Sequence, residues 1–589
     1  MTRRTTHQRT IDHWRYLCVV VALGSLPVMA LWHTAGLQIF ERGDKGARFL
    51  QLQGDARTLR VRPVPAYRGL ITDRNGEPLA VSTPVVTLWA NPKELLDGGK
   101  SLESLARRLG VPLATLRARL NDNAKREFMF LARRLTPAEA KPILDLNLKG
   151  VYGRDEYKRY YPAGEVTAQL VGFTNVDDKG QEGLELAYDQ WLAGVPGERR
   201  VLQDRNTQVI KELELIRSEK PGNDLALSID LRLQYVAYRE LRVALEAHRA
   251  AAGSVVMLDA RTGEVLAMVS QPSFNPNARG QPDNHAQRNR AITDLVEPGS
   301  VMKPFTMVAA LESGRYRPDT PIDTAPGWVR FGTKTYRDPH SYGLLDLTGV
   351  LAKSSQVGTT KVAMTLETDQ IRGVFERVGL GQGLDTGFPG ENAGNLPSKH
   401  KWATVEHASL AFGYGLTVTP LQVARAYAVL ANTGVRRPVT LLRQESGTPP
   451  AEGQRVISAA VAGQVRTMLK AVVESGTGKK AAIPVYASAG KTGTSHKVGV
   501  GGYQEHRYIS LFAGMAPADN PELVTVVVVD DPQVDGYFGG VVAAPVFSRV
   551  TSAALRLLAI QPPTPFLPKP GAVVDVTTTV VASTRRGAG

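Results

Sequence analysis

The stretch that decides the fold reads Glu297-Pro298-Gly299-Ser300-Val301-Met302-Lys303-Pro304-Phe305. Pro298-Gly299 predicts a turn, and Ser300 would then open a helix on which residues three apart share one face. Lys303 can therefore reach the Ser300 hydroxyl. A serine hydroxyl attacks well only when a base removes its proton, and a lysine is such a base only if its surroundings lower its pKa. Taken alone, the stretch leaves open a capping serine beside a solvated lysine.

A second stretch, Ala489-Gly490-Lys491-Thr492-Gly493-Thr494-Ser495, lies before a strand pattern. On a strand beside a cleft, the Lys491 ammonium and a threonine hydroxyl can bind a carboxylate. Gly493 would let the backbone of a substrate approach, because glycine has no side chain. The alternative is an ordinary exposed edge strand, which lysine and glycine both suit.

The third stretch is Lys353-Ser354-Ser355-Gln356-Val357-Gly358. Ser-x-x-Lys, a Ser-x-Asn type triplet and Lys-Thr-Gly, in this order along a chain, are the motif set of penicillin-binding proteins and related β-lactamases. The joint occurrence is far more specific than any single motif, and on it the sequence resembles the class B penicillin-binding proteins. Within that class it is similar to the septal, FtsI-like transpeptidases.

Further segments of the class B pattern extend the resemblance from the amino-terminal apolar segment to about residue 560. They are Arg68-Gly69 through Leu79-Ala80, Tyr160-Tyr161-Pro162, Gly180-Gln181-Glu182-Gly183-Leu184-Glu185 and Ala411-Phe412-Gly413-Tyr414-Gly415. The resemblance implies an α+β fold. It comprises a penicillin-binding, β-lactamase-like transpeptidase domain with an antiparallel sheet packed with helices, an elongated amino-terminal pedestal module of the dimerisation type, and one transmembrane helix.

The resemblance also assigns expected roles to residues of the three motifs. Ser300 would be acylated, Lys303 would be its base, and Ser354 would relay a proton near the leaving amine. Lys491, Thr492 and Thr494 would hold the carboxylate of a D-Ala-D-Ala stem peptide or of a β-lactam, with Gly493 beside them. The backbone N–H groups of Ser300 and Thr494 would form the oxyanion hole.

One position departs from the family pattern, because Gln356 stands where the family has Asn. Glutamine carries the same amide on one more methylene, so it could still reach substrate or Lys303 after a small displacement. A misplacement of about 1 Å can cost roughly 10²-fold in rate. The departure therefore bears on turnover and substrate preference more than on the fold.

Composition narrows the setting. The 589 residues exceed one domain, and 43% hydrophobic with 22% charged residues is typical of a globular protein. The net charge of +15 comes from scattered Lys and Arg, which argues against nucleic acid and is compatible with anionic lipid, an anionic wall polymer or simple solubility. The single cysteine, Cys18, fits an exported protein without disulfides and excludes cysteine-rich metal sites. No metal or cofactor is expected.

The amino-terminal segment predicts the compartment. Tyr16 to Phe40 has no charged residue, and Arg3, Arg4, Arg9 and Arg15 precede it. An apolar span of about 20 residues crosses a bilayer, and its basic flank stays in the cytoplasm. We therefore expect a single-pass inner (cytoplasmic) membrane protein with an extracytoplasmic, periplasmic catalytic domain. A cleaved signal peptide ending at Val28-Met29-Ala30 is the alternative.

The predicted organisation is a cytoplasmic tail at 1–15, the anchor at 16–40, the pedestal module at 41–220, the transpeptidase domain at 221–560 and a disordered tail at 561–589. Within it we expect a helical insert at 101–148, a helix at 231–248, strands at 254–259, 265–270, 508–513 and 524–529, helices over 300–470, and a last helix at 545–558. Strands on both sides of a helical middle favour one antiparallel sheet packed against helices.

The leading functional hypothesis is a peptidoglycan D,D-transpeptidase that cross-links stem peptides at the division septum and is acylated by β-lactams. The alternatives are a low-turnover division scaffold or β-lactam sensor, which Gln356 favours, a β-lactamase, and a condition-specific copy of the septal enzyme. The resemblance implies a membrane glycosyltransferase of the SEDS type (FtsW-like) and other division proteins as partners. His496 and Tyr537-Phe538-Gly539-Gly540 remain candidates for the cleft wall or for ordinary packing.

Overall fold

The computed structural model describes residues 12–38, 59–97, 102–203, 209–278, 284–445, 447–499 and 501–562. Its internal contacts divide the chain into two compact units. The first consists of Met1–Arg68, Ser82–Lys158 and Ala193–Gly222, and the second of Gly69–Val81, Arg159–Leu192 and Asn223–Gly589. The second unit thus takes up two segments of the amino-terminal part of the chain. The start of the expected pedestal module, up to residue 58, and the tail after residue 562 lie outside the described residues.

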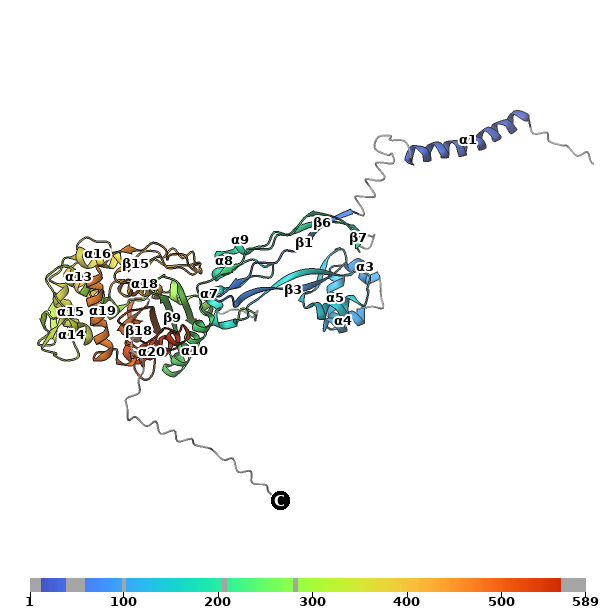
Figure 1. Ribbon diagram of the computed structural model, residues 1–589. Helices are drawn as coiled ribbons and strands as arrows, with labels where there is room; N and C mark the ends of the chain where they lie inside the picture. The colour runs from blue at the N-terminus through green and yellow to red at the C-terminus, as the bar shows by residue number, and fades with distance from the viewer. Residues whose placement is uncertain are drawn as a thin grey trace, which may run out of the picture. The chain divides into compact units, whose positions relative to one another are not determined.

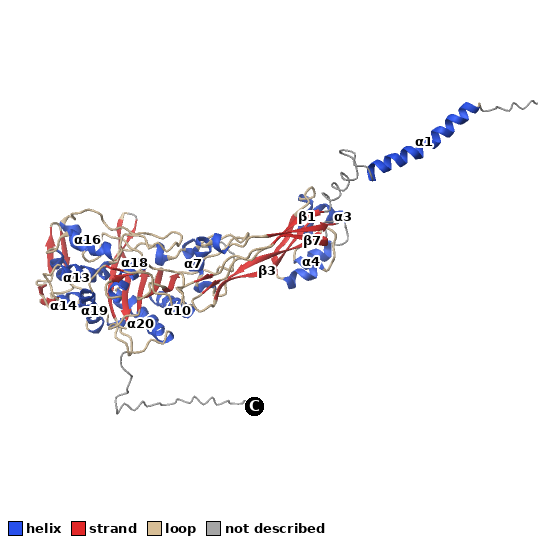
Figure 2. Ribbon diagram, turned by 45° about the horizontal axis from the view of Figure 1, so that its top comes forward, coloured by secondary structure: helices blue, strands red, loops and turns tan. Residues whose placement is uncertain are grey.

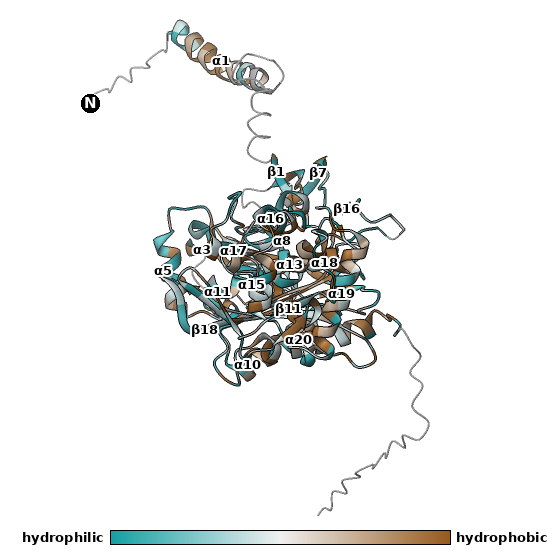
Figure 3. Cartoon of the chain, turned by 90° about the vertical axis from the view of Figure 1, so that its left-hand side faces the viewer, coloured by the Kyte–Doolittle hydropathy of each residue, from teal (hydrophilic) through white to brown (hydrophobic). Residues whose placement is uncertain are grey.

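The apolar amino-terminal segment forms one long helix, α1 (His13–Gln38). Among the described residues it is the helix that is long and apolar enough to cross a membrane, over His13–Ala35, and none of that span is buried in the protein. Its hydrophobic colouring is plain in Figure 3. Pro27 lies inside the helix, where membrane helices tolerate it. The predicted anchor therefore has the expected secondary structure.

The first unit contains two groups of strands (Figure 2). One is an antiparallel sheet in the order β1-β6-β7, and in the other β3 pairs with β4 and with β5. The bounds are β1 (Leu59–Val64), β3 (Pro78–Ala90), β4 (Met129–Leu135), β5 (Val151–Tyr160), β6 (Gly197–Gln203) and β7 (Val209–Arg217), and residues 78–81 of β3 and 159–160 of β5 belong to the second unit.

The helical insert predicted at 101–148 contains three short helices and one strand, β4, that the sequence reading did not anticipate, and a fourth short helix lies just before it. The helices are α3 (Pro92–Asp97), α4 (Leu102–Leu109), α5 (Leu113–Asp122) and α6 (Pro137–Leu144). Leu105, Leu116 and Leu120 are buried together with Leu88 of β3. Leucines three to four residues apart lie on one helix face, so these helices bury that face against the strand.

The second unit is built around a five-stranded antiparallel sheet in the order β10-β9-β19-β18-β17. The bounds are β9 (Ala252–Asp259), β10 (Val265–Gln271), β17 (Ala489–Gly499), β18 (Gly502–Ala516) and β19 (Leu523–Asp530). All four strands expected from the sequence are present, and β18 is longer than expected. The sheet joins strands separated by more than 200 residues, and β19 occupies its centre.

Helices cover both faces of this sheet (Figure 1). Alternate residues of one strand face opposite sides, so Val256 and Leu258 of β9 pack into one core cluster and Val255 and Met257 into another. The first cluster includes α13 (Lys303–Glu312), α18 (Pro420–Ala431) and α19 (Ala459–Glu474). The second includes α10 (Leu231–His248) and α20 (Gly539–Leu557). Burial of both faces explains why β9, β10 and β19 carry consecutive apolar residues, such as Val526 to Val529.

The other elements of the second unit are short. They are β2 (Ile71–Thr72), η2 (Gly164–Val166), α7 (Ala168–Val171), α8 (Gly183–Ala187), α9 (Asp189–Leu192), β8 (Leu225–Ala226), α11 (Asn284–Gln287), α12 (Arg290–Thr293), η3 (Gly299–Met302), β11 (Pro321–Asp323), β12 (Trp328–Phe331), β13 (Lys334–Arg337), β14 (Leu344–Asp346), α14 (Leu347–Ala352), α15 (Gln356–Ala363), α16 (Thr368–Arg377), α17 (Thr404–Leu410), β15 (Val435–Arg436), β16 (Gln454–Arg455) and η4 (Lys479–Ala481).

The turn at Asp73 to Gly76 connects two parts of the second unit that are far apart in the sequence. The buried Asp73 carboxylate accepts hydrogen bonds from the backbone N–H groups of Asn75 and Glu77, both at 2.8 Å. Its other oxygen accepts from the N–H of Leu231 at 3.0 Å, where α10 begins. One side chain therefore fixes the turn and satisfies the first turn of a helix 158 residues later in the chain.

Candidate active site

Ser300 lies on a short turn of 3₁₀-helix, η3, that leads directly into α13. Gly299 precedes it with a φ of +56°, a left-handed conformation that glycine adopts readily. In a 3₁₀ turn the side chains at i and i+3 are eclipsed. Lys303, the first residue of α13, is therefore on the Ser300 side of the turn, as the spacing predicts. Ser300 itself is half-buried.

Lys303 is completely buried, and its amine is directed at the second motif. Its Nζ donates to the Ser354 carbonyl oxygen at 2.5 Å and lies 3.2 Å from Ser354 Oγ. Burial lowers the pKa of Lys303 to about 7, although the nearby Asp338 carboxylate acts in the opposite direction. An amine in this state can accept a proton near neutral pH, which an ordinary lysine cannot do.

Lys491, the lysine of the third motif, is also completely buried and meets the same serine. Its Nζ donates to Ser354 Oγ at 2.9 Å and to the Thr492 carbonyl oxygen at 3.2 Å. Burial, and the positive charge of Lys303 close by, hold the pKa of Lys491 well below its ordinary value. The fold thus brings three stretches together that are separated by 51 and 137 residues.

The strand β17, which carries Lys491 to Thr494, runs directly beside the turn of Ser300. A Cβ at Gly493 would lie 2.9 Å from the Pro298 carbonyl oxygen and 3.0 Å from Val301 Cγ1. Ser495 Oγ donates to the Glu297 carbonyl oxygen at 2.8 Å. Gly493 is therefore required for the close packing of the strand against η3, a reason that sequence reasoning did not supply.

The hydroxyl groups of the two threonines of β17 contact different neighbouring segments. Thr492 Oγ1 lies 2.9 Å from Thr477 Oγ1 and 3.3 Å from Lys491 Nζ. Thr494 Oγ1 accepts from the N–H of Gly539 at 3.0 Å, and its carbonyl oxygen accepts from the Tyr414 hydroxyl at 3.3 Å. Sequence reasoning missed Thr477, because its hydroxyl contact with Thr492 depends on tertiary packing.

The glycine-rich segment before α18, Ala411 to Gly415, packs against the turn that carries Ser300. Gly299 N–H donates to the Gly413 carbonyl oxygen at 3.0 Å. Gly413 has a φ of +89°, and a Cβ there would lie only 2.1 Å from the Gly299 carbonyl oxygen. A glycine at this position is thus a steric requirement for the position of Ser300.

Gln356, the residue that differs from the family pattern, is the first residue of α15. Its backbone N–H donates to Asp338 Oδ1 at 2.6 Å. Its side chain is half-buried. Sequence reasoning did not single out Asp338, which is buried and also accepts from the hydroxyl of Ser355.

The two remaining sequence candidates belong to one aromatic surface near β17. His496 is exposed and its ring centre lies 4.8 Å from that of Tyr508, which stacks on Tyr537 at 3.8 Å. The backbone after Phe538 reaches β17 through the Gly539 contact to Thr494. Sequence reasoning missed Tyr508, because it comes to lie opposite His496 only when β17 pairs with β18.

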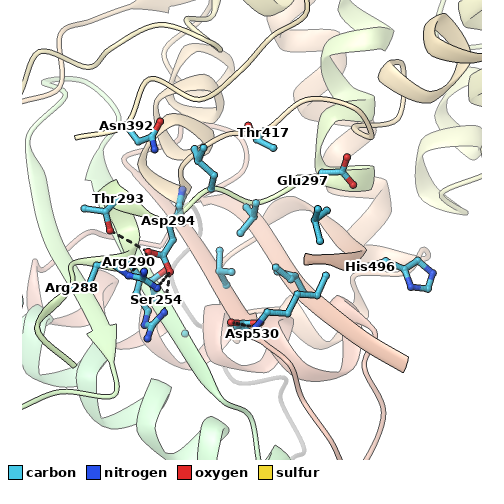
Figure 4. A pocket seen from close by; sticks show the side chains of 18 residues that line it. Ser254, Arg288, Arg290, Thr293, Asp294, Glu297, Asn392, Thr417, His496 and Asp530 are labelled. Atoms are coloured by element: carbon cyan, nitrogen blue, oxygen red, sulfur yellow. Dashed lines mark hydrogen bonds and ion pairs between the residues drawn. The ribbon is translucent and has the colours of Figure 1, made fainter. Parts of the chain in front are cut away.

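A cavity of about 450 Å³, with Glu297 among its lining residues, is shown in Figure 4. Arg288 and Arg290 both form ion pairs with Asp294, and Lys497 pairs with Asp530. The ring of His496 points away from the Arg288–Asp294 cluster (Figure 4). None of the three motif stretches contributes its serine or lysine to this cavity. No cluster of three or more His, Cys, Asp or Glu suited to a metal ion is found in the described part of the chain.

The fold and the site define a serine acyl-transfer protein with two buried lysines, and comparison with known proteins gives its family. Residues 253–552 match the penicillin binding protein transpeptidase domain, and residues 63–227 match the penicillin-binding protein dimerisation domain. The chain belongs to the class B penicillin-binding proteins, which combine these two domains.

Its relatives include the peptidoglycan D,D-transpeptidase FtsI of Escherichia coli K12, which is 44% identical over 95% of this chain and 94% of that protein. The probable peptidoglycan D,D-transpeptidase PbpC of Pseudomonas aeruginosa is 42% identical over 93% of this chain and 96% of that protein. Among solved structures, the transpeptidase domain of Burkholderia pseudomallei penicillin-binding protein 3 is 41% identical and covers 58% of this chain and 98% of that one, with a TM-score of 0.53.

Proposed function

We propose that this protein cross-links peptidoglycan stem peptides at the division septum through an acyl-enzyme on Ser300. It is a serine-type peptidoglycan D,D-transpeptidase, and β-lactams acylate it. The observation that carries the role of Ser300 is the meeting of Lys303 and Lys491 at the Ser354 hydroxyl, beside the turn on which Ser300 lies.

In the proposed acylation step, Ser300 Oγ attacks the carbonyl carbon of the penultimate D-Ala while its proton passes to Lys303 Nζ. The backbone N–H groups of Ser300 and Thr494 would bind the oxyanion, and removal of one such donor typically costs about 3 kcal/mol of transition-state stabilisation. Ser354, bonded to both amines, would return a proton to the leaving D-Ala amine. A pKa of about 7 supports Lys303 as the base, because a neutral amine is then available at neutral pH.

In the second step, an amine of a neighbouring stem peptide attacks the Ser300 ester. The new peptide bond forms, the ester bond breaks, and Ser300 Oγ regains its proton. We assign Lys491, Thr492 and Thr494 to the substrate carboxylate. With a β-lactam, the amine released by ring opening stays attached to the acyl group, so the adduct persists.

The test of this proposal is intact-mass analysis of the full-length chain in detergent after incubation with benzylpenicillin. We expect one added β-lactam mass on the wild type and none on Ser300→Ala. Ser313→Ala, at the end of α13, is a matched control that should still be labelled. An adduct on Ser300→Ala, or no adduct on the wild type, contradicts the proposal.

One observation favours a second candidate, a low-turnover scaffold or β-lactam sensor. It is the glutamine at position 356, where the family pattern has asparagine and where one more methylene displaces the amide. Measurements with a thioester substrate separate the candidates. A transpeptidase gives both a long-lived penicillin adduct and thioester turnover, a sensor gives the adduct alone, and a β-lactamase loses the adduct rapidly.

We further propose that α1 is an uncleaved anchor with its basic amino end in the cytoplasm and the catalytic domain outside. The support is the helix α1, which has no charged residue after Arg15 and follows Arg3, Arg4 and Arg9 in the sequence. As domain limits we propose 41–220 for the pedestal module and 221–560 for the transpeptidase domain. Protease protection of the amino-terminal tail in sealed inverted vesicles would contradict this orientation.

We also propose a membrane glycosyltransferase of the SEDS type as the partner, because neither matched domain is a glycan polymerase. Cross-linking of glycan strands is useful only where glycan strands are polymerised. Co-purification of the two full-length proteins from co-expressing membranes tests this proposal, and a complete failure to co-purify in mild detergent would contradict it.

A further inference from the structure

Asp338 is a buried carboxylate that follows β13 and faces the amino end of α15. The residue is 8% exposed. Oδ1 accepts from the backbone N–H groups of Gln356 at 2.6 Å and Val357 at 3.3 Å, and Oδ2 accepts from Ser355 Oγ at 2.5 Å. The N–H of Asp338 donates to the Gly327 carbonyl oxygen at 3.0 Å, which fixes its own backbone. One side chain thus holds three consecutive residues at the start of a helix.

The residue just before this clamp, Ser354, has an unfavourable backbone conformation. Its φ is +57°, in the left-handed region that non-glycine residues rarely adopt. Such a conformation persists only where the surrounding structure enforces it. On one side the end of α14 does so, through the N–H of Ser354 to the Leu351 carbonyl and that of Ser355 to the Val350 carbonyl. On the other side Asp338 does so.

The enforced conformation directs Ser354 at both lysines. Its hydroxyl accepts from Lys491 at 2.9 Å and lies 3.2 Å from Lys303, and its carbonyl oxygen accepts from Lys303 at 2.5 Å. A relaxation of Ser354 toward negative φ would move these two oxygens away from the amines. The positions of all four polar groups therefore depend on what holds the residues after Ser354.

Asp338 also supplies a charge. The charged groups that face Lys303 among the described residues are Lys491 from β17 and Asp338 from the segment after β13, while Ser300 and Ser354 are neutral. The carboxylate raises the pKa of Lys303 against the lowering that burial causes. A negative charge here favours the protonated amine, the state in which Lys303 has just taken a proton from a hydroxyl.

We propose that Asp338 is a positioning residue for the acylation step: it clamps Ser355 and Gln356 so that Ser354 stays between Lys303 and Lys491, and it provides a negative charge near Lys303. The inference rests on the proposed function of Ser300. Asp338 binds the Ser355 hydroxyl and the backbone N–H of Gln356, so it holds the Ser354-Ser355-Gln356 segment without using the side chain of residue 356.

The experiment measures the second-order rate of labelling of the full-length chain by a fluorescent penicillin between pH 5 and 9, for the wild type and Asp338→Asn. Labelling of the wild type should rise with pH around the Lys303 pKa of about 7. For Asp338→Asn we expect a rate about 10²-fold lower, because a shift of about 1 Å has such an effect. We also expect the midpoint of the rise to move to lower pH, because the protonated amine loses its partner charge.

Two further variants separate the two parts of the role. Ser355→Ala removes one contact of the clamp and keeps the charge, so labelling should slow with no change of the midpoint. Asp346→Asn removes an exposed carboxylate that caps the preceding helix, α14, and should change neither quantity. A purely structural role for Asp338 would slow labelling without moving the midpoint.

A folded Asp338→Asn protein with the rate and the midpoint of the wild type overturns the inference, and so does an equal shift in Asp346→Asn. Thermal unfolding of each variant monitors folding. Where Asp338→Asn does not fold, Ser355→Ala decides, because a folded Ser355→Ala protein with an unchanged rate overturns the clamp. A wild type that is not labelled at Ser300 refutes the proposed function instead, and the two failures are thereby distinguished.

Discussion

Two fully buried amines around one hydroxyl are the most unusual feature at the scale of single residues. A buried ammonium without strong partners costs several kcal/mol, and a protein avoids this cost by keeping the amine neutral. The pKa values of both Lys303 and Lys491 are lowered in this way. Burial of these amines destabilises the fold, and it also produces a base that works near neutral pH.

This exchange predicts that Lys303→Met stabilises the protein below neutral pH while it abolishes labelling by penicillin. The pKa of Lys303 is lower in the folded chain than in the unfolded chain, so the unfolded chain binds the proton more tightly. The buried Lys303 amine therefore destabilises the folded chain fully below about pH 7, and this destabilisation disappears as pH rises toward 10.5. Because one pKa unit corresponds to about 1.4 kcal/mol, we expect a gain of about 1–3 kcal/mol at pH 6 from chemical denaturation.

The matched control is Lys361→Met, which changes a half-buried lysine on α15 whose amine donates to the Asp323 carbonyl oxygen. No gain at low pH is expected there. The prediction is contradicted if Lys303→Met is less stable than the wild type at pH 6 and its loss of stability is no larger at pH 9. The buried amine would then stabilise the fold.

Sequence reasoning reached the lysines and serines of the site because their spacing is tied to local elements. Lys303 follows Ser300 by three residues on one helical turn, and Lys491 stands on a recognisable strand. The positive φ of Ser354 and the clamp by Asp338 could not be predicted. The clamp depends on contacts across 17 to 19 residues that have no periodic signal, and the clamp helps to enforce the φ of Ser354.

At the scale of elements, the site depends on the close approach of three backbone segments: η3, β17 and the glycine-rich segment before α18. Gly413 and Gly493 occupy the two lines of contact, where a side chain has no room. The turn that carries Ser300 is therefore held between backbones, with little freedom to relax.

Gly413→Ala tests this packing. The new Cβ would lie 2.1 Å from the Gly299 carbonyl oxygen, so the turn of Ser300 must shift. We expect labelling by penicillin to fall by at least about 10²-fold, and stability to fall by more than the about 1 kcal/mol that a positive φ alone costs. Gly415→Ala is the control, since Gly415 also has a positive φ of +82° but its nearest neighbour would be 3.8 Å away. Equal effects of the two changes would show that the turn is not held this tightly.

The elements that sequence reasoning predicted best have strong local signals. The helix α10 has the expected bounds because Asp230 caps it, through a hydrogen bond to the N–H of Arg232, and because its apolar stripe is regular. The helix α20 begins at Gly539, six residues before the expected start at Pro545. Its first N–H bonds to Thr494 on a distant strand, and the proline is tolerated inside. The strand β4 was missed because its pairing with β3 is a long-range contact.

At the scale of the whole molecule, the anchor predicts where the protein resides. Replacement of Leu23 and Leu26 by arginine should release the chain from the membrane fraction after a carbonate wash, since each charge in the middle of the span costs about 2.5–3.5 kcal/mol. Both side chains are exposed on α1. Val61→Arg, at an exposed position of β1, is the control and should leave the chain in the membrane. Retention of the double variant would show that another part of the chain binds the membrane.

The division into units could be predicted only coarsely. A boundary near residue 220 follows from the change of sequence character at Lys220-Pro221-Gly222-Asn223. The transfer of Gly69–Val81 and Arg159–Leu192 to the second unit has no local signal. It depends on contacts such as that of Asp73 with the start of α10.

The position of β19 in the centre of the sheet has a consequence for the order of events during synthesis. Its residues, Leu523–Asp530, are added when nearly nine-tenths of the chain already exists, yet both β9 and β18 need them as neighbours. Until then the nascent sheet consists of a hairpin and a second strand pair, each with an unprotected edge open to wrong partners. A ribosome stalled before codon 523 would therefore leave a polypeptide that can neither close its sheet nor react with penicillin, and quality-control proteases should recognise it.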